Sequence, residues 1–133
     1  MTSAPFDPSI VAAAQRARRE APFLALLLDR EPGMAETFLS GHLPPLKTIH
    51  ADLDDEPVAR RLRLARRRLA LRVAIGDLAG VDDLTSVTQT LSDFADRALD
   101  AAIVAAIAER TPDAAPVGFA AIALGKQGSR ELN

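Results

Sequence analysis

The chain has 133 residues, the size of one modest domain, with 48% hydrophobic and 26% charged residues, so a packed core is expected and global disorder is not. Its 16 basic and 18 acidic side chains give a formal net charge of -2, which argues against a dedicated nucleic-acid binder, and the absence of Cys excludes disulfides, thiolate metal sites and Cys nucleophiles. No apolar run approaches the roughly 20 residues that cross a bilayer, and the opening MTSAPFDPSI lacks the pattern of a secretory signal, which predicts a cytoplasmic protein.

Alanine and leucine, the strongest helix formers, together make up a third of the chain, which is therefore expected to be mainly α-helical. The first predicted helix runs over 8–20, with Asp7 as its N-cap and a proline at its first position. A second helix follows over 21–30 and is broken by the Glu-Pro-Gly sequence of 31–33. A short third helix is predicted over 34–40.

Two longer helices are predicted in the second half of the chain. Pro57 begins the first, which carries apolar stripes on two faces and frays at the glycines of 76–80. Two stripes require two neighbours, so this helix should lie inside a bundle. The next helix, over 84–108, has apolar or small residues at alternating spacings of three and four: Leu84, Val87, Leu91, Phe94, Ala98, Ala101, Ala105 and Ala108. Residues 1–111 are thus predicted to form a helical bundle.

The composition changes near residue 112. A linker is expected over 112–116, and the apolar run over 117–124 has the length and flanking Pro and Gly of a buried strand. A Gly-rich loop follows over 125–129, and 130–133 has the composition of a helix start. The predicted fold is therefore a mainly α chain, with a helical bundle followed by the first strand and loop of a truncated α/β domain over 117–133.

Seven arginines fall within 13 residues, without an acidic residue between them: Arg60, Arg61, Arg63, Arg66, Arg67, Arg68 and Arg72. One interpretation is a phosphate or nucleic-acid surface. A helical projection scatters them around most of the helix, and acidic residues at 52–56 and 77–83 can neutralise them. Interhelix ion pairs and a solvated bundle surface are therefore the favoured interpretation. His42 and His50 lie eight residues apart without a zinc spacing, so no metal site is predicted.

The loop after the predicted strand is a candidate phosphate site. A strand, a Gly-rich loop and a helix start present backbone N–H groups to an anion. Gly125 and Gly128 allow close backbone approach, Lys126 supplies a positive charge, and Ser129 supplies a hydroxyl group. The loop is not a Walker A motif, because Gln127 occupies the required Ser/Thr position. A tight turn without a ligand is the alternative.

The last residues also resemble a known family. The run GFAAIALGKQGSRELN is similar to the start of the nucleotidyltransferase domain of glutamine-synthetase adenylyltransferase/adenylyl-removing enzymes. Gln127 departs from the family pattern, in which an apolar residue is usual there. Upstream, residues 21–33 and 65–102 resemble the family's N-terminal helices, so the resemblance covers essentially the whole chain. The matching residues of the terminal motif are Gly125, Lys126, Gly128, Ser129, Glu131, Leu132 and Asn133.

The resemblance implies a large enzyme that attaches AMP from ATP to a Tyr of glutamine synthetase and removes it by phosphorolysis, releasing ADP. It further implies control by glutamine and the PII signal protein, a role for Gly128 and Ser129 in contacting nucleotide phosphates, and supporting positions at the helix start for Arg130, Glu131 and Asn133. The position of the motif fits the N-terminal, deadenylylating copy. Mg2+ would be held by a later Ser-Asp-x-Asp, which this sequence lacks. No catalytic or metal-binding residue is therefore expected in the chain, which should be inactive alone as a piece of a larger enzyme.

Two other functions are compatible with the residues. The chain could be a helical protein-interaction module without catalysis, in which case the final segment would be only a sheet edge or tail. The arginine block could instead contact RNA or DNA, and such binding would weaken steeply with salt. The family resemblance favours the enzyme, with glutamine synthetase and PII as partners and neither nucleic acid nor a membrane as a target.

Overall fold

A computed structural model describes residues 5–46, 49 and 56–133. His50 and the acidic residues of 52–55, which entered the predictions above, lie outside the described residues. The described chain is mainly helical, as predicted. Its helices are α1 (Pro8–Glu20), α2 (Pro22–Arg30), α3 (Pro32–Leu39), α4 (Val58–Leu78), α5 (Leu84–Arg110) and α6 (Gly125–Gly128).

Proline fixes the starts of the first three helices. Each has Pro in its first turn, where the missing N–H costs no hydrogen bond. For α3 this moves the start to Pro32, two residues before the predicted one. Asp7 caps α1 by accepting hydrogen bonds from the Ser9 N–H (2.8 Å) and the Ser9 hydroxyl (2.7 Å). These bonds hold the pKa of Asp7 below its usual value. The ionised cap therefore stabilises α1 fully above the usual pKa of Asp, and this contribution is lost as the pH falls through the lowered pKa.

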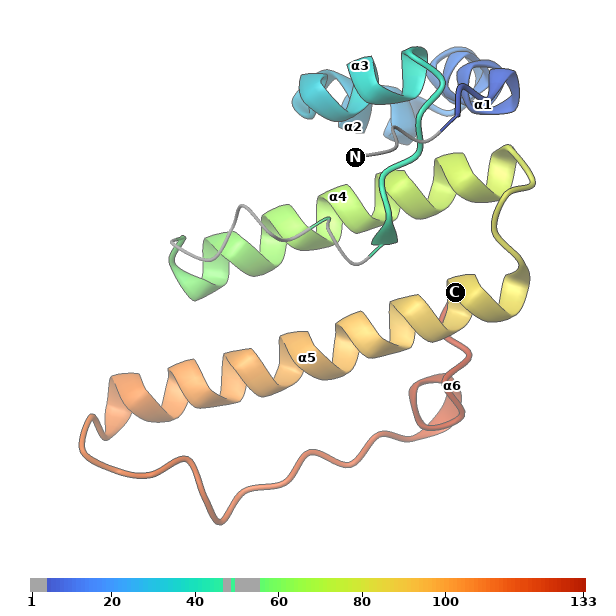
Figure 1. The fold of residues 1–133 in the computed structure, drawn as a ribbon. Coiled ribbons are helices and arrows are strands. Elements are labelled where there is room, and N and C mark those ends of the chain that lie inside the picture. Colours follow the sequence, from blue (N-terminus) through green and yellow to red (C-terminus); the bar gives the residue numbers. More distant parts are fainter. Residues whose placement is uncertain (1–4, 47–48, 50–55) are drawn as a thin grey trace.

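Helix α4 lies between two neighbours, as its two apolar stripes predict. Helices α1 to α3 pack over one side of it, and α5 runs antiparallel to it on the other side (Figure 1). Leu71 and Ile75 of α4 and Phe38 of α3 are fully buried in one hydrophobic core. The remaining members of this core are Ile10, Ala13, Ala14, Ala17, Leu27, Leu28 and Ala35.

Helix α5 is far less covered than the periodicity of its sequence suggests. Ser92 is its single buried residue, while Leu84, Leu99 and Val104 are each about half exposed or more. Within the described residues, α4 is the one helix that makes extensive contact with α5. Nor does any described helix combine the length and the apolar character that crossing a bilayer would require.

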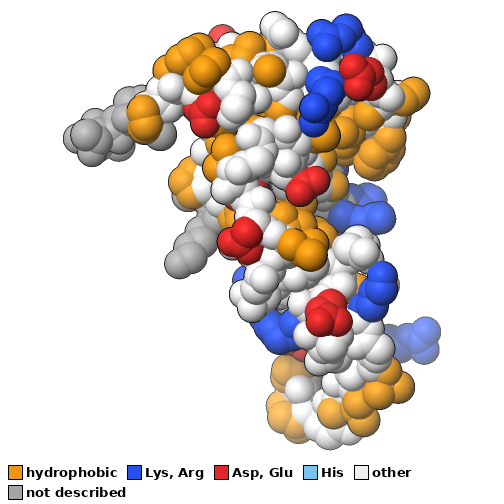
Figure 2. All heavy atoms as spheres, turned by 90° about the vertical axis from the view of Figure 1, so that its right-hand side faces the viewer, with side chains coloured by type: hydrophobic (Ala, Val, Ile, Leu, Met, Phe, Trp, Pro, Cys, Tyr) orange, Lys and Arg blue, Asp and Glu red, His pale blue; other side chains and the backbone are white. Residues whose placement is uncertain are grey.

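The strand predicted over 117–124 does not form. The segment runs back along α5 as irregular chain (Figure 1), and no strand occurs anywhere in the described part of the molecule. Its large side chains are exposed, from 67% for Phe119 to 83% for Ile122. A strand requires a hydrogen-bonded neighbour, and no other described segment supplies one. Hydrophobic side chains accordingly gather at the lower end of the molecule in Figure 2, where Figure 1 places this segment.

The loop and helix start predicted after the strand are also rearranged. Residues Gly125–Gly128 form the single helical turn α6, and the residues of 130–133 are not helical. Arg130 has a positive φ of 61°, in the left-handed region that ends helices. The turn closes through a hydrogen bond from the Glu131 N–H to the Lys126 carbonyl (2.8 Å). The helical turn therefore ends just before the residues at which the composition predicted that a helix would begin.

A buried ion pair fixes the turn between α4 and α5. The Arg72 guanidinium donates to both carboxylate oxygens of Asp82 (2.5 and 3.3 Å) and to the Pro44 carbonyl (2.6 Å). The Arg72 side chain is 6% exposed and that of Asp82 12%. Gly76 lies one turn after Arg72 and directly beneath this pair, so a Cβ there would overlap the Asp82 carboxylate and the Arg72 guanidinium.

The variant Gly76→Ala should therefore destabilise the protein, although helix propensity alone predicts a gain of about 1 kcal/mol. Displacing a buried Arg–Asp pair costs more than that gain, and we expect a net loss of about 1–2 kcal/mol in the free energy of unfolding. Urea denaturation followed by circular dichroism measures it.

The matched control is Gly33→Ala in α3, because a Cβ at Gly33 meets nothing within 4 Å. This control should be neutral or stabilising by up to about 1 kcal/mol. Equal effects of the two alanines would contradict the packing described around Gly76.

Candidate functional site

The predicted loop residues come together in one small exposed turn. The Lys126 ammonium group donates to the Asn133 side-chain oxygen (2.7 Å), and the Ser129 hydroxyl donates to a Glu131 carboxylate oxygen (3.1 Å). The partner of Lys126 is a neutral amide, so no described carboxylate pairs with its positive charge. Four residues that the sequence singled out, Lys126, Ser129, Glu131 and Asn133, thus share one site.

Glycine is required twice in this turn. Gly125 has a φ of +59°, which residues with a side chain rarely adopt. A Cβ on Gly128 would lie 2.8 Å from the Ala123 carbonyl oxygen, so the chain can fold this tightly because Gly128 has none. The first N–H groups of a helical turn have no partner within it and are open to an external acceptor. The turn therefore offers an ammonium group, a hydroxyl and backbone N–H groups on a compact exposed surface.

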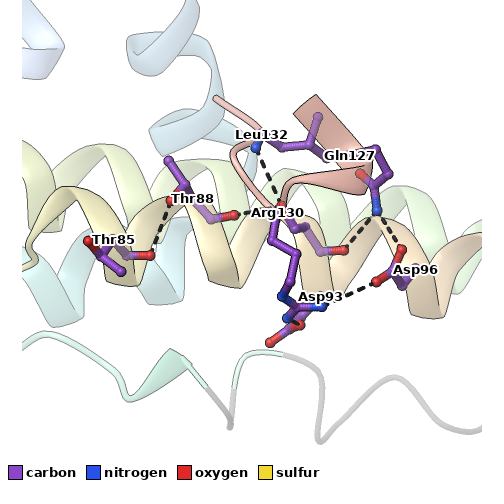
Figure 3. A network of polar contacts seen from close by, with 8 residues as sticks. Thr85, Thr88, Asp93, Asp96, Gln127, Arg130 and Leu132 are labelled. Atoms are coloured by element: carbon purple, nitrogen blue, oxygen red, sulfur yellow. Dashed lines mark hydrogen bonds and ion pairs between the residues drawn. The ribbon is translucent and has the colours of Figure 1, made fainter. Parts of the chain in front are cut away.

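Helix α5 holds this turn in place through a polar network (Figure 3). The Gln127 amide donates to the Asp96 carboxylate (2.5 Å) and to the Ser92 carbonyl (3.2 Å). Arg130 pairs with Asp93 and approaches Asp96 (3.6 Å). These contacts place the terminal turn against the middle of α5.

The residues of α5 that anchor the turn were not predicted from the sequence. Ser92 receives the Leu132 N–H on its hydroxyl (3.4 Å) while donating to the Thr88 carbonyl (2.9 Å). One available signal was Gln127, which stands where the family usually has an apolar residue. A second was helical spacing on α5, where Ser92 lies four residues and Asp93 three residues before Asp96. Arg130, expected at a helix start, instead acts as the ionic link to α5.

Most of the arginine block is engaged in ion pairs. Arg67 and Arg68 of α4 both donate to Glu31, at 2.6 and 2.9 Å, and Arg60 pairs with Glu56 at 2.8 Å. Glu31 lies at the junction of α2 and α3 and is 7% exposed. With the buried pair of Arg72, these contacts place four of the seven arginines in ion pairs, as the favoured interpretation predicts for part of the block. The main partner, Glu31, lies outside the predicted acidic groups.

Three arginines of the block are outside these pairs, namely the half-buried Arg61 and two exposed ones. Arg63 and Arg66 are exposed on α4 and make no ion pair with any described residue. They flank a small cleft of about 330 Å³, which Phe23 and Leu27 of α2 also line. This part of the block remains a charged surface and plays no part in the core.

His42 shares a hydrogen bond with the Ser40 hydroxyl (3.2 Å) at the end of α3. No group of three or more His, Cys, Asp or Glu that could hold a metal ion occurs over residues 5–46, 49 and 56–133.

Comparison with known proteins points to one family. A family model described as glutamate-ammonia ligase adenylyltransferase matches residues 9–133. Bifunctional glutamine synthetase adenylyltransferase/adenylyl-removing enzymes from Xanthobacter autotrophicus and Caulobacter vibrioides are each 37% identical, over 84% and 88% of this chain. The corresponding enzyme of Neisseria meningitidis serogroup B is 33% identical over 88% of it. The aligned region is 13% of the length of the first two relatives and 15% of the third. No solved structure gives a significant match.

The anchoring network predicts the behaviour of the double variant Asp93→Ala/Asp96→Ala. Removing the acceptors of Gln127 and Arg130 should detach the terminal turn from α5. The helices should persist, because exposed pairs of this kind each contribute about 1 kcal/mol or less. Hydrogen exchange of the amides in 125–132 should accelerate about fivefold or more, as measured by mass spectrometry.

Glu109→Ala is the matched control, since Glu109 is an exposed carboxylate near the other end of α5. Its exchange pattern should equal that of the unaltered chain. Unchanged protection in the double variant would show that the contacts in Figure 3 do not hold the turn.

Proposed function

This chain belongs to the glutamate-ammonia ligase adenylyltransferase family, and we propose that it is the N-terminal part of an enzyme that transfers adenylyl groups to and from glutamine synthetase. The observation that carries the proposal is the family match, which extends over 9–133 and so includes both the helices and the terminal turn. The relatives are named for both attachment and removal of the adenylyl group. The chain spans about an eighth of their length.

Of the two reactions, we assign this part to adenylyl removal. The terminal Gly-Lys motif resembles the start of a nucleotidyltransferase domain, and the relatives are named for adenylyl removal as well as attachment. In that reaction a phosphate oxygen attacks the phosphorus of a tyrosine-bound AMP. The bond from phosphorus to the tyrosine oxygen breaks, the tyrosine regains a proton, and ADP leaves. Glutamine synthetase is then the substrate, and the PII signal protein is the proposed regulator.

The role proposed for the terminal turn is to bind phosphate groups of the nucleotide. Lys126 carries a positive charge without a described carboxylate partner, and phosphate accepts hydrogen bonds from ammonium, hydroxyl and backbone N–H groups. Gly125 and Gly128 keep the backbone of the turn compact. The Ser129 hydroxyl now donates to Glu131, so a bound phosphate would take over this donor. The residues present fit a phosphate at this site.

The same residues do not fit a magnesium ion. Nucleotidyl transfer needs metal-held charge neutralisation, which carboxylates provide. Glu131 is the only carboxylate in the terminal turn, and the sequence contains no Ser-Asp-x-Asp. We therefore propose that these 133 residues bind and position phosphate but do not catalyse transfer by themselves.

Titration with ATP, ADP and inorganic phosphate tests the proposal. Saturable binding is expected for the 133-residue chain. Lys126→Ala should weaken it about tenfold or more, because a hydrogen bond to a charged group contributes about 1.5–3 kcal/mol. Gly128→Val should abolish it, because the added side chain collides with the Ala123 carbonyl. Isothermal titration calorimetry measures both effects.

Arg97→Ala and Gly33→Val serve as controls, since Arg97 is an exposed cation on α5 and Gly33 has open space around it. Both should bind as the unaltered chain does. Binding that Lys126→Ala and Gly128→Val leave intact would refute the proposed role of the turn. Phosphate-dependent release of ADP from adenylylated glutamine synthetase by this chain, above a protein-free control, would refute its inactivity.

A further inference from the structure

An apolar groove lies between α4 and α5 and borders the terminal turn, because Leu132 and Asn133 also line it. It has a volume of about 760 Å³. Leu69 and Val73 of α4 form one wall, and Val87 and Leu91 of α5 form the other. Leu84, at the open end of the α5 wall, is 74% exposed. Exposed apolar surface of this extent in a groove is typical of a site that another molecule covers.

Opposite charges mark the two ends of the groove. Arg66 lies at one end and Asp77, eleven residues later on α4, at the other. The cleft beside α2 that Phe23 and Arg63 line also has Arg66 in its wall, so Arg66 borders both hollows. Arg63 and Arg66 therefore provide two guanidinium groups without described partners at the same end.

We propose that this groove binds an amphipathic helical segment of a protein partner, with acidic residues in its first turn and basic residues in its last. A rise of 1.5 Å per residue makes the distance from Arg66 to Asp77 about 16 Å, which is about three helical turns. Three turns of an amphipathic helix present apolar residues at positions i, i+3, i+4 and i+7 to such a groove. The partner's carboxylates meet Arg63 and Arg66, and its cations meet Asp77.

The charge order also sets the direction in which the segment docks. Acidic residues stabilise the N-terminus of a helix and basic residues its C-terminus. The segment's N-terminus therefore lies beside Arg66, so that it runs parallel to α4 and antiparallel to α5 (Figure 1). A nucleotide or other polyanion suits the groove less well, because its walls are apolar and Asp77 closes one end. The proposal goes beyond the phosphate-binding role and does not depend on it.

The probe is a fluorescent 14-residue peptide that a staple on its polar face holds helical. It carries leucines on one face, two glutamates in the first turn and two lysines in the last. Anisotropy titration with the 133-residue chain should show saturable binding. Arg63→Glu/Arg66→Glu should weaken it at least tenfold without unfolding the protein, because these side chains are exposed and unpaired within the described residues. Leu84→Ser should weaken it at least threefold.

Charge exchange provides the decisive control. A peptide with lysines in place of its two glutamates should bind the Arg63→Glu/Arg66→Glu variant more tightly than the unaltered chain. Arg97→Glu, on an exposed part of α5 outside the groove, should change nothing.

Three results would overturn the proposal. The first is the absence of saturable peptide binding, and the second is binding that the charge reversal leaves unchanged. The third is occupation of the groove by something else: ATP binding that the charge reversal abolishes, or a dimer of this chain that Leu84→Ser dissociates in sedimentation. Each would assign the groove to a different occupant or to none.

Discussion

The burial of arginine in α4 is the constraint on which the rest of the structure depends. A helix that carries seven arginines and also passes through the core must place some guanidinium groups where water is scarce, and such charges require partners. Glu31 meets this need at the junction of α2 and α3 by accepting from Arg67 and Arg68. Arg72 does so at the other end, where it joins Pro44 to Asp82. These pairs orient α4 toward the first three helices and fix the turn into α5.

The position of the candidate phosphate site depends on the turn between α4 and α5. Helix α5 leaves α4 at Asp82 and Asp83, and its middle carries the carboxylates that hold Gln127 and Arg130. The helical part therefore acts as a support that presents the turn of 125–129, and much of α5 stays uncovered. The same arrangement leaves the groove beside α4 open. Support for the candidate phosphate site and space for the proposed partner segment thus arise from one sparsely covered helix.

The sequence predicted the helices well because their signals are local. Asp7 with Pro8, Pro57 before α4, and the three-four periodicity of α5 all act within a few residues. Pro32 was expected to break a helix and instead begins α3. Strand formation over 117–124 depends on a neighbouring strand, which local pattern does not supply. Glu31 was missed because it stands in a break between helices, 36 residues from Arg67. The Gly-Lys turn was found, but its anchoring by Gln127 and Arg130 depends on tertiary contacts with α5.

The arginines buried against Glu31 and Asp82 hold the helices together, and we propose that nucleotide phosphates bind at the terminal turn instead. Backbone amide chemical shifts of the 15N-labelled chain during titration with ATP distinguish the two sites. We expect saturable shifts confined to residues 124–131 and their α5 contacts at 92–96, with the amides of Arg67, Arg68 and Arg72 unmoved. Shifts centred on α4 at 60–72, with the terminal turn unaffected, would contradict the proposal.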